Sequence, residues 1–223
     1  MTRSDSFRLD SDGIYKCEAF QEFGWQTHGF GTRVSSPPVD VTLRQIHSGC
    51  VVNAAGIEDR SRQGDALVTN EIGRSIGVRT ADCVPILLLD SKNRAVAAVH
   101  AGWRGTAAEI VRCALEQLAS DFESAASDIY AAIGPCIRSC CYEVGPDVAR
   151  QFARFFPDGT PRVGNTRLNL PGINRRQMEE AGVLPARIFD CALCTACHSD
   201  QFFSYRREPG NPGRMIAAIS RLA

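Results

Sequence analysis

The feature that most constrains the fold is a succession of short apolar runs, each bounded by polar or turn-forming residues. The runs are rich in valine, isoleucine and leucine and lie at residues 39–43, 66–69, 75–78, 84–89, 95–99, 129–133 and 215–219. They are too short for typical helices, and their β-branched content is typical of buried strands. The sequence therefore predicts a chain organised around β-sheets.

Three stretches with helical features lie in the second half of the chain, after most of these runs. Thr106 and Glu109 have the spacing of a capping box, and apolar residues repeat on one helical face, at Ala107, Ile110, Val111, Ala114, Leu115 and Leu118. A second helix is predicted to begin at Pro146, and a third to run from about residue 171 to Gly182. Because strands cluster ahead of helices, we expect an α+β layered sandwich of mixed sheets and packed helices, formed by residues 1–223 as one domain.

Charge and composition exclude several classes of function. The chain has 25 basic and 25 acidic residues, so no net field favours nucleic acid or an anionic membrane surface. It has no apolar run of about 18 residues, and its first residues lack the apolar stretch of a signal peptide. We therefore expect a cytoplasmic protein whose ten cysteines are mostly reduced thiols.

Three potential metal ligands stand at predicted strand boundaries. His100 follows the run 95–99, Cys83 precedes the run 84–89, and His47 ends the segment RQIH, which we expect to precede a third strand. Two imidazoles and one thiolate are acceptable zinc ligands, and three protein ligands leave the open position of a catalytic site. The spacing of these three residues along the chain is not diagnostic of a metal site. His100 could equally be a hydrogen-bonded core residue, and Cys83 could be a small core side chain.

The segment after His100 reads AGWRG and leads into the first predicted helix. A helix N-terminus with Arg104 beside it suits an anion such as phosphate. Trp103 could stack on a purine or simply cover the core.

Sequence blocks spread over most of the chain resemble one known family. The blocks are LRQIHSG, GDALVT, TADCVPILL, VHAGWRGT, IGPCIRSCCYEVG and FFSYRRE, in this order. They closely resemble the YfiH family, also called the laccase-domain or multicopper polyphenol oxidase family. This resemblance implies one zinc ion per chain, held by His47, Cys83 and His100. It further implies phosphorolysis of adenosine, inosine, guanosine and methylthioadenosine, with a side activity that deaminates adenosine.

Such a reaction needs an anion site and groups that assist the purine or the attacking water. We predict Arg44, Arg79, Arg104 and Arg207 as phosphate ligands, with Arg206 as a further flanking arginine. Cys83, His100, Asp82 and Arg104 are the predicted catalytic residues, and Asp82 and Asp65 are candidates for an acid or base. Purine nucleosides and inorganic phosphate are the expected partners, and the oligomeric state is left open.

Other metal sites are less favoured by the sequence. Copper oxidase chemistry needs more clustered histidines than the four in this chain, so copper is not expected. Cys194 and Cys197 form a C-x-x-C pair beside Cys191 and His198, and Cys141-Tyr142-Glu143 resembles half of a cytidine-deaminase signature, but the two halves lie far apart. We therefore interpret Cys136, Cys140 and Cys141 as small buried side chains.

Two further functions remain open at this stage. Cys83 and His100 could act without metal as the nucleophile and base of a cysteine hydrolase. Alternatively, zinc could merely stabilise a partner-binding module that has no enzymatic activity.

Overall fold

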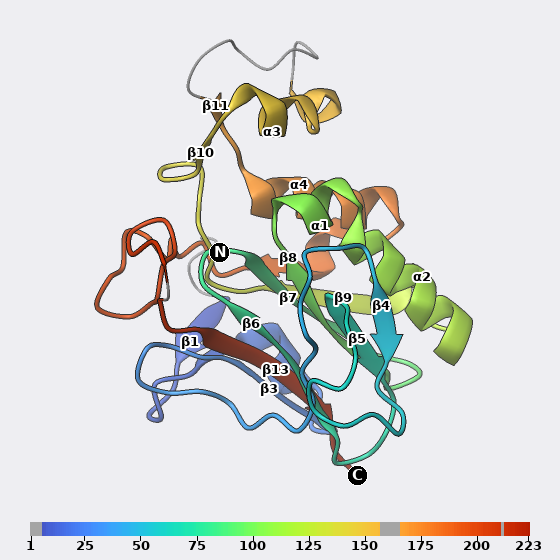
Figure 1. The fold of residues 1–223 in the computed structure, drawn as a ribbon. Helices are drawn as coiled ribbons and strands as arrows, with labels where there is room; N and C mark the ends of the chain where they lie inside the picture. The colour runs from blue at the N-terminus through green and yellow to red at the C-terminus, as the bar shows by residue number, and fades with distance from the viewer. Residues whose placement is uncertain (1–5, 157–165, 211) are drawn as a thin grey trace.

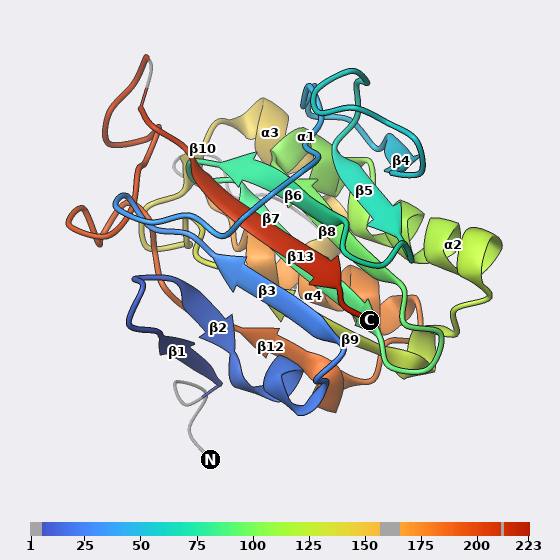
Figure 2. The same cartoon turned by 90° about the horizontal axis from the view of Figure 1, so that it is seen from below.

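Two β-sheets and a helical layer are stacked in the computed structural model, which describes residues 6–156, 166–210 and 212–223 (Figures 1 and 2). The central layer is a six-stranded sheet, with a five-stranded sheet against one face and helices against the other. The predicted α+β layered sandwich is confirmed.

The central sheet has the order β12-β9-β7-β8-β5-β4. Its strands are β4 (Val51–Asn53), β5 (Ala66–Thr69), β7 (Val84–Asp90), β8 (Val96–Ala101), β9 (Ile129–Ile133) and β12 (Ile188–Asp190). The outer pairs β4–β5 and β9–β12 are parallel, while the inner pairs are antiparallel. Every residue of β7 is buried, because Leu88 faces the helices and Leu87 faces the second sheet. Burial of each apolar side chain contributes roughly 1.5–3 kcal/mol, and the strand is apolar at every position except its last, Asp90.

The second sheet has the order β1-β2-β3-β13-β6 and is antiparallel. Its strands are β1 (Phe7–Leu9), β2 (Tyr15–Cys17), β3 (Gln26–Phe30), β6 (Ser75–Thr80) and β13 (Met215–Arg221). Phe30, Ile76 and Ile219 pack with Leu87 and Leu89 of the central sheet. The last strand thus lies between β3 and β6 and closes the core between the sheets (Figure 2).

The helical layer consists mainly of α2 and α4, with α1 beside them (Figure 1). The helices are α1 (Trp103–Ala107), α2 (Ile110–Phe122), α3 (Pro146–Arg150) and α4 (Leu170–Glu180). Short 3-10 turns are η1 (Glu18–Glu22), η2 (Ala126–Asp128), η3 (Ala153–Phe155) and η4 (Pro185–Arg187). A separate two-stranded antiparallel sheet consists of β10 (Glu143–Val144) and β11 (Thr166–Arg167). Within the described residues, no helix is both long and apolar enough to cross a membrane.

The predicted first helix is in fact two helices. Glu109 takes a left-handed backbone conformation with φ 55° and separates α1 from α2, and no side chain caps either helix. The predicted capping box at Thr106 and Glu109 is therefore wrong. Thr106 is instead buried, and it accepts hydrogen bonds from Asn174 Nδ2 at 3.0 Å and Gln177 Nε2 at 2.9 Å. These bonds fix α4 against α1.

The other two predicted helices are present, with different bounds. The helix predicted to begin at Pro146 does so, but it ends as α3 after five residues. Phe152 beyond it is buried and holds this segment to the helical core. The third predicted helix is α4, which begins one residue earlier than expected with Asn169 as its cap, since Asn169 Oδ1 accepts a hydrogen bond from Gly172 N at 3.1 Å.

All the predicted strands are present except 39–43, which is a loop. It makes one parallel bridge, between Val41 and Ile76. The N–H and hydroxyl of Thr42 donate to Asp59 Oδ1, at 2.8 and 2.7 Å, and not to a neighbouring strand. This side-chain bonding replaces the ladder that the run would otherwise form.

Candidate metal centre and substrate cavity

The predicted ligands Cys83 and His100 meet because β7 and β8 are antiparallel neighbours. Val84, the first residue of β7, pairs with Ala101, the last residue of β8. Cys83 therefore precedes β7 at the same edge of the sheet where β8 delivers His100.

Gly102 lies where these two strand ends meet the loop that carries His47. A Cβ atom at this position would lie 3.0 Å from Cys83 Sγ and 3.1 Å from His47 Cδ2. The glycine is required here by close approach and not by its backbone angle, since its φ is −72°. The glycine of the AGWRG segment thus makes room for two of the three predicted ligands.

His47 is held in place by the buried carboxylate of Asp65. His47 has φ 58°, a left-handed conformation that costs a non-glycine residue roughly 1 kcal/mol. Its N–H donates to Asp65 Oδ1 at 2.9 Å, and the N–H and hydroxyl of Ser48 donate to Asp65 Oδ2 at 2.6 and 2.7 Å. Hydrogen bonds to a charged group contribute roughly 1.5–3 kcal/mol each, so these bonds outweigh the strain.

The same carboxylate orients His100. Asp65 Oδ1 lies 2.9 Å from His100 Nδ1, and both side chains are buried. A proton held between Nδ1 and the carboxylate leaves Nε2 free to bind a metal, which is the usual pairing of carboxylate and histidine behind a metal ligand. Burial alone would raise the pKa of Asp65, but hydrogen bonds from His100 and Ser48 lower it to about 2.

The three predicted ligands are close enough to share one ion. One ligand atom from each of His47, Cys83 and His100 lies within 4.8 Å of the others, and the two imidazole rings cross at 74° with centroids 4.9 Å apart. Burial opposes ionisation of Cys83, but the imidazoles of His100 and His47 lower its pKa to about 6. The site thus stabilises the thiolate, the form that binds a metal.

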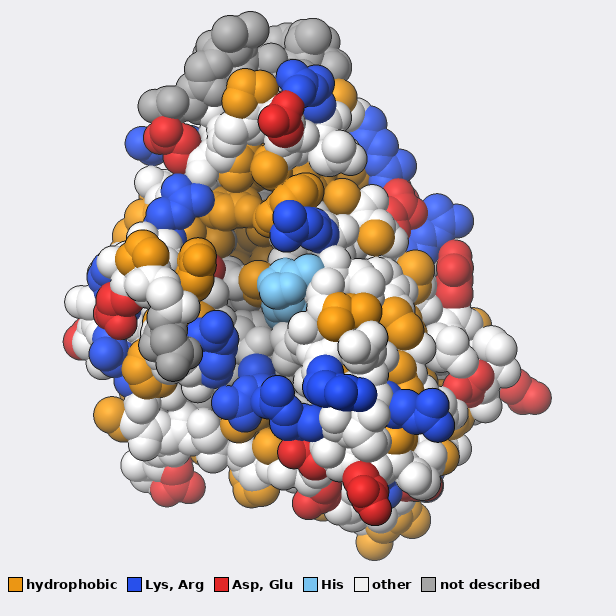
Figure 3. Space-filling view, in the orientation of Figure 1, with side chains coloured by type: hydrophobic (Ala, Val, Ile, Leu, Met, Phe, Trp, Pro, Cys, Tyr) orange, Lys and Arg blue, Asp and Glu red, His pale blue; other side chains and the backbone are white. Residues whose placement is uncertain are grey.

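A cavity of about 740 Å³ opens in front of these residues. Figure 3 shows a hollow with apolar side chains, a histidine at its edge and basic side chains gathered around it. The lining residues are Leu43, Gln45, His47, Arg60, Arg79, Ala81, Asp82, Cys83, His100, Trp103, Arg104, Ile137, Tyr142, Leu170, Tyr205, Arg206 and Arg214. This volume is typical of a small-molecule site.

Arginines dominate the polar lining, and they include the predicted Arg79 and Arg104. Arg79 lies in β6, and its backbone exchanges two hydrogen bonds with the amide of Gln45, at 2.8 and 2.9 Å. Within the described ranges, neither arginine forms an ion pair with a carboxylate. Arg60 and Arg214 also line the cavity, but they lie in loops without any distinguishing motif and were not predicted from the sequence.

Two other predicted phosphate ligands lie outside this lining. Arg44 donates to Ser61 O at 3.2 Å on the surface. Arg207 donates to the carbonyl groups of Thr195 and Phe202, at 2.9 and 2.7 Å, and pairs with Glu208. Its guanidinium therefore stabilises a loop, and the structure does not bring it together with Arg79 and Arg104.

Asp82 lines the cavity but also connects its walls. Its Oδ1 accepts a hydrogen bond from Thr195 Oγ1 at 2.6 Å, and its Oδ2 accepts one from Arg206 N at 2.7 Å. Its φ of 88° turns the chain between β6 and β7. Asp82 thus fixes the segments around Thr195 and Arg206 to the strand edge that carries Cys83.

Trp103 and Arg104, at the start of α1, also line the cavity. The guanidinium carbon of Arg104 lies 4.4 Å from the centroid of the Trp103 ring, in the range of a cation–π contact. Because α1 has only five residues, Arg104 contributes more positive charge here than the helix dipole does.

The remaining histidines lie elsewhere. His28 is buried between the sheets, where its Nε2 accepts a hydrogen bond from Cys17 N at 2.9 Å, and burial lowers its pKa to about 3. His198 lies against Phe202 with ring centroids 6.5 Å apart. Neither histidine is near enough to join His47 and His100 in the metal group.

All ten cysteines are free in the structure, and four of them form a second group. Cys140, Cys141, Cys194 and Cys197 bring their sulfur atoms within 4.8 Å of one another. Cys136 is buried as expected, whereas the same expectation is wrong for Cys140, which is exposed, and for Cys141, which is partly exposed. Packing into the core therefore does not explain this second group.

The sequence is similar to those of known proteins. The model of a family described as multi-copper polyphenol oxidoreductase laccase matches residues 29–222. A purine nucleoside phosphorylase from Bacteroides thetaiotaomicron is 40% identical over 162 residues, which cover 70% of this chain and 60% of that protein. Adenosine deaminase RL5 from an unknown prokaryotic organism is 42% identical over 164 residues, which cover 70% of this chain and 62% of that protein. The chain thus spans less than two thirds of the length of these two relatives.

The fold is also similar to a solved structure. The crystal structure of the hypothetical protein YfiH from Bacillus licheniformis superposes with a TM-score of 0.87 at 27% identity. The superposition covers 98% of this chain and 100% of that one.

Proposed function

The chain belongs to the multi-copper polyphenol oxidoreductase laccase family, and from this premise we propose that it is a zinc-dependent purine nucleoside phosphorylase. The substrates would be adenosine, inosine, guanosine and methylthioadenosine, with a side activity that deaminates adenosine. The main support is that an open group of three ligands borders a cavity lined by arginine and aromatic side chains.

His47, Cys83 and His100 would hold the metal. Their mutual distances, the small residue at Gly102 and the carboxylate behind His100 all fit a metal ion. When bound, a zinc ion would supply a Lewis acid for the purine leaving group and for the deamination. The donor set favours zinc over a multicopper centre, because the remaining two histidines lie elsewhere.

The arginines would bind the phosphate nucleophile. Arg60, Arg79, Arg104, Arg206 and Arg214 line the cavity, whereas Asp82 is the one carboxylate that the described part of the chain contributes to that lining. Charge-assisted hydrogen bonds from guanidinium groups are the usual means of holding phosphate. We assign phosphate binding first to Arg79 and Arg104, which line the cavity together with the three metal ligands.

The apolar part of the cavity would accommodate the nucleoside. Trp103, Tyr142 and Tyr205 present aromatic rings to it, and such rings stack on purines. Burial raises the pKa of Tyr142 to about 12, so its hydroxyl stays protonated and can donate to the leaving base. Asp82 keeps lone pairs free for a sugar that gains positive charge in the transition state.

Product analysis tests this function. Inosine, adenosine or methylthioadenosine would be incubated with the protein, with and without phosphate, and the products separated by chromatography. Free base and sugar 1-phosphate formed only with phosphate would support the proposal. The absence of any product from every purine nucleoside would refute it.

A metal-free cysteine hydrolase is a second candidate, favoured by the lowered pKa of Cys83 beside His100. The two candidates differ in what metal removal does. The phosphorylase proposal predicts that zinc-free protein is inactive and recovers with added zinc. Full activity in zinc-free protein would favour the cysteine mechanism.

A further inference from the structure

Cys140, Cys141, Cys194 and Cys197 come from two segments that the sheet topology brings together. The first segment follows β9 and the second follows β12, and these strands are parallel neighbours. Because the carboxyl ends of parallel strands lie at one edge of a sheet, both segments leave it side by side. A bridge between Cys136 and Cys194 continues the pairing beyond the strands.

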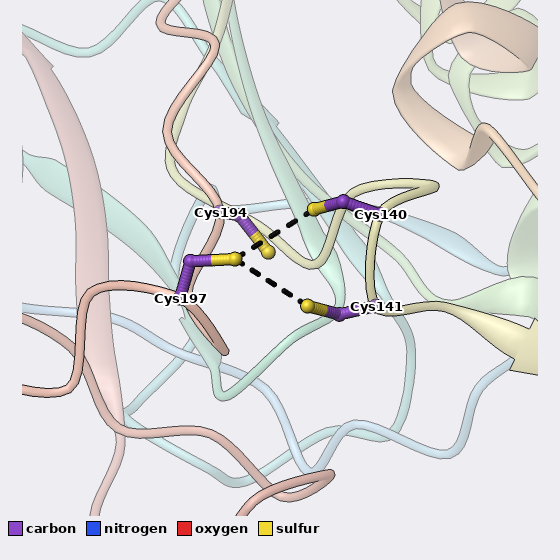
Figure 4. A group of neighbouring side chains, drawn as sticks. All are labelled: Cys140, Cys141, Cys194 and Cys197. Atoms are coloured by element: carbon purple, nitrogen blue, oxygen red, sulfur yellow. Dashed lines mark hydrogen bonds between the residues drawn. The ribbon is translucent and has the colours of Figure 1, made fainter.

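The four sulfur atoms converge on one point (Figure 4). Cys197 Sγ lies 3.7 Å from Cys140 Sγ and 3.4 Å from Cys141 Sγ. In a tetrahedral zinc site with Zn–S bonds of about 2.3 Å, the sulfurs stand about 3.8 Å apart. The observed separations are close to this value.

The local backbone resembles that of a metal-binding C-x-x-C turn. Cys197 N and His198 N both donate to Cys194 O, at 3.2 and 3.1 Å, so the turn folds around Cys194. The backbone of Arg138, Cys197 and Ala196 also hydrogen-bonds to the Cys194 side chain, so main-chain donors surround this sulfur. Such hydrogen bonds orient a ligand atom toward a bound metal.

Other uses of four clustered thiols fit less well. A disulfide needs sulfurs about 2.05 Å apart, far closer than 3.4 Å. An iron–sulfur cluster holds its own iron and sulfide atoms between the cysteines, so it needs a wider set than one within 4.8 Å. A single metal ion with tetrahedral coordination fits the four thiols better than a disulfide or an iron–sulfur cluster does.

We propose that Cys140, Cys141, Cys194 and Cys197 form a structural tetrathiolate zinc site, separate from the site of His47, Cys83 and His100. Binding displaces the remaining thiol protons to solvent and leaves no open coordination position for substrate. The chain would then carry two zinc ions when both sites are filled.

The proposed zinc site lies next to residues that form the cavity wall. Tyr142, which lines the cavity, follows Cys141 directly, and Thr195, which donates to Asp82, follows Cys194. A zinc ion would therefore clamp two segments of the cavity wall to each other. The ion pair between Arg138 and Asp190, with N–O distances of 2.7 and 2.8 Å, already joins the same segments.

Metal analysis tests the proposal without any measurement of nucleoside cleavage. Protein saturated with zinc and then desalted would be analysed by mass spectrometry of its metals. We expect two zinc ions per wild-type chain, and one in the double variant Cys141→Ser with Cys197→Ser. The control Cys113→Ser, in α2, should keep two. A wild-type ratio of one that the double variant retains would overturn the proposal, and so would iron in place of zinc.

The variant His47→Ala separates this proposal from the proposed function. It should lose the other zinc ion and keep the one held by four cysteines. Zinc that is lost on Cys141→Ser with Cys197→Ser but kept on His47→Ala supports the tetrathiolate site whatever the catalytic activity proves to be.

A measurement on the wild type covers the case in which the double variant does not fold. Cobalt substituted for zinc should give the intense visible and charge-transfer bands of tetrahedral cobalt bound to four thiolates. Cobalt spectra that show at most one thiolate ligand per ion would overturn the proposal.

Discussion

Asp65→Asn is the most direct test of how the metal centre is built. Asp65 is completely buried and accepts hydrogen bonds from Ile46, His47, Ser48 and His100. An asparagine has the same shape but only one acceptor oxygen, and its NH₂ group is a donor. The substitution therefore sets a donor against groups that are themselves donors.

Either orientation of the new amide disrupts the centre. If its NH₂ faces Ser48, the Ser48 N–H, now 2.6 Å from a carboxylate oxygen, loses its acceptor. If its NH₂ faces His100, Nδ1 must become an acceptor, which puts the ring proton on Nε2, the nitrogen that should bind metal. One buried donor without a partner costs about 1–3 kcal/mol.

A cost of about 2 kcal/mol corresponds to roughly 30-fold weaker zinc binding, within the 10- to 100-fold range typical of partners behind metal ligands. The assay is a competition titration of metal-free protein against a coloured zinc chelator. Asp59→Asn is the matched control, because Asp59 also accepts loop hydrogen bonds, but from Thr42 and away from the ligands. Zinc at the proposed site of four cysteines would be bound equally by Asp65→Asn and Asp59→Asn, so it does not contribute to the difference between them. Equal zinc affinity in Asp65→Asn and wild type would refute this account of the centre.

Three further predictions concern the same cavity. Gly102→Ala places a Cβ 3.0 Å from Cys83 Sγ, so zinc affinity in the same titration should fall at least tenfold. An affinity within twofold of wild type would contradict the close packing. Arg79→Ala should raise KM for phosphate at least tenfold, and Arg44→Ala, outside the cavity, should leave it within twofold, as steady-state kinetics would show. In metal-free protein the pKa of Cys83 is lowered to about 6, so iodoacetamide labelling of its thiolate should rise with pH through a midpoint near pH 6. In His100→Ala this midpoint should move toward the ordinary thiol value of 9.0. An unchanged midpoint would contradict the role of the imidazole.

The strands that could be predicted are those buried on both faces. β7 is apolar at nearly every position, because one face meets the helices and the other meets the second sheet. β1 and β4 are three-residue strands with partly exposed side chains, so their composition resembles that of loops. The run 39–43 was wrongly predicted as a strand for the opposite reason, since Val41 and Leu43 are buried without a full strand partner.

The candidate site was only partly predictable. Residue chemistry made His47, Cys83 and His100 competent ligands, but motif resemblance selected them, because their contact depends on the register of β7 and β8. The role of Asp65 as a shared hydrogen-bond acceptor could not be read from the sequence either. Arg60 and Arg214 come from loops whose position depends on the whole fold, so no local pattern separated them from surface arginines such as Arg44.

The four cysteines show why distance along the chain is a poor argument against a site. In the sequence, the C-x-x-C pair at Cys194 and Cys197 lies far from its possible partners, since 56 residues separate Cys141 from Cys197. That distance is the length of a crossover through α3 and α4, which returns the chain to the sheet as β12, parallel to β9. A parallel pair brings the two following segments to one edge whatever lies between them. Cysteines placed just after such a pair therefore meet by topology, and their clustering is a property of the strand order that neither motif alone contains.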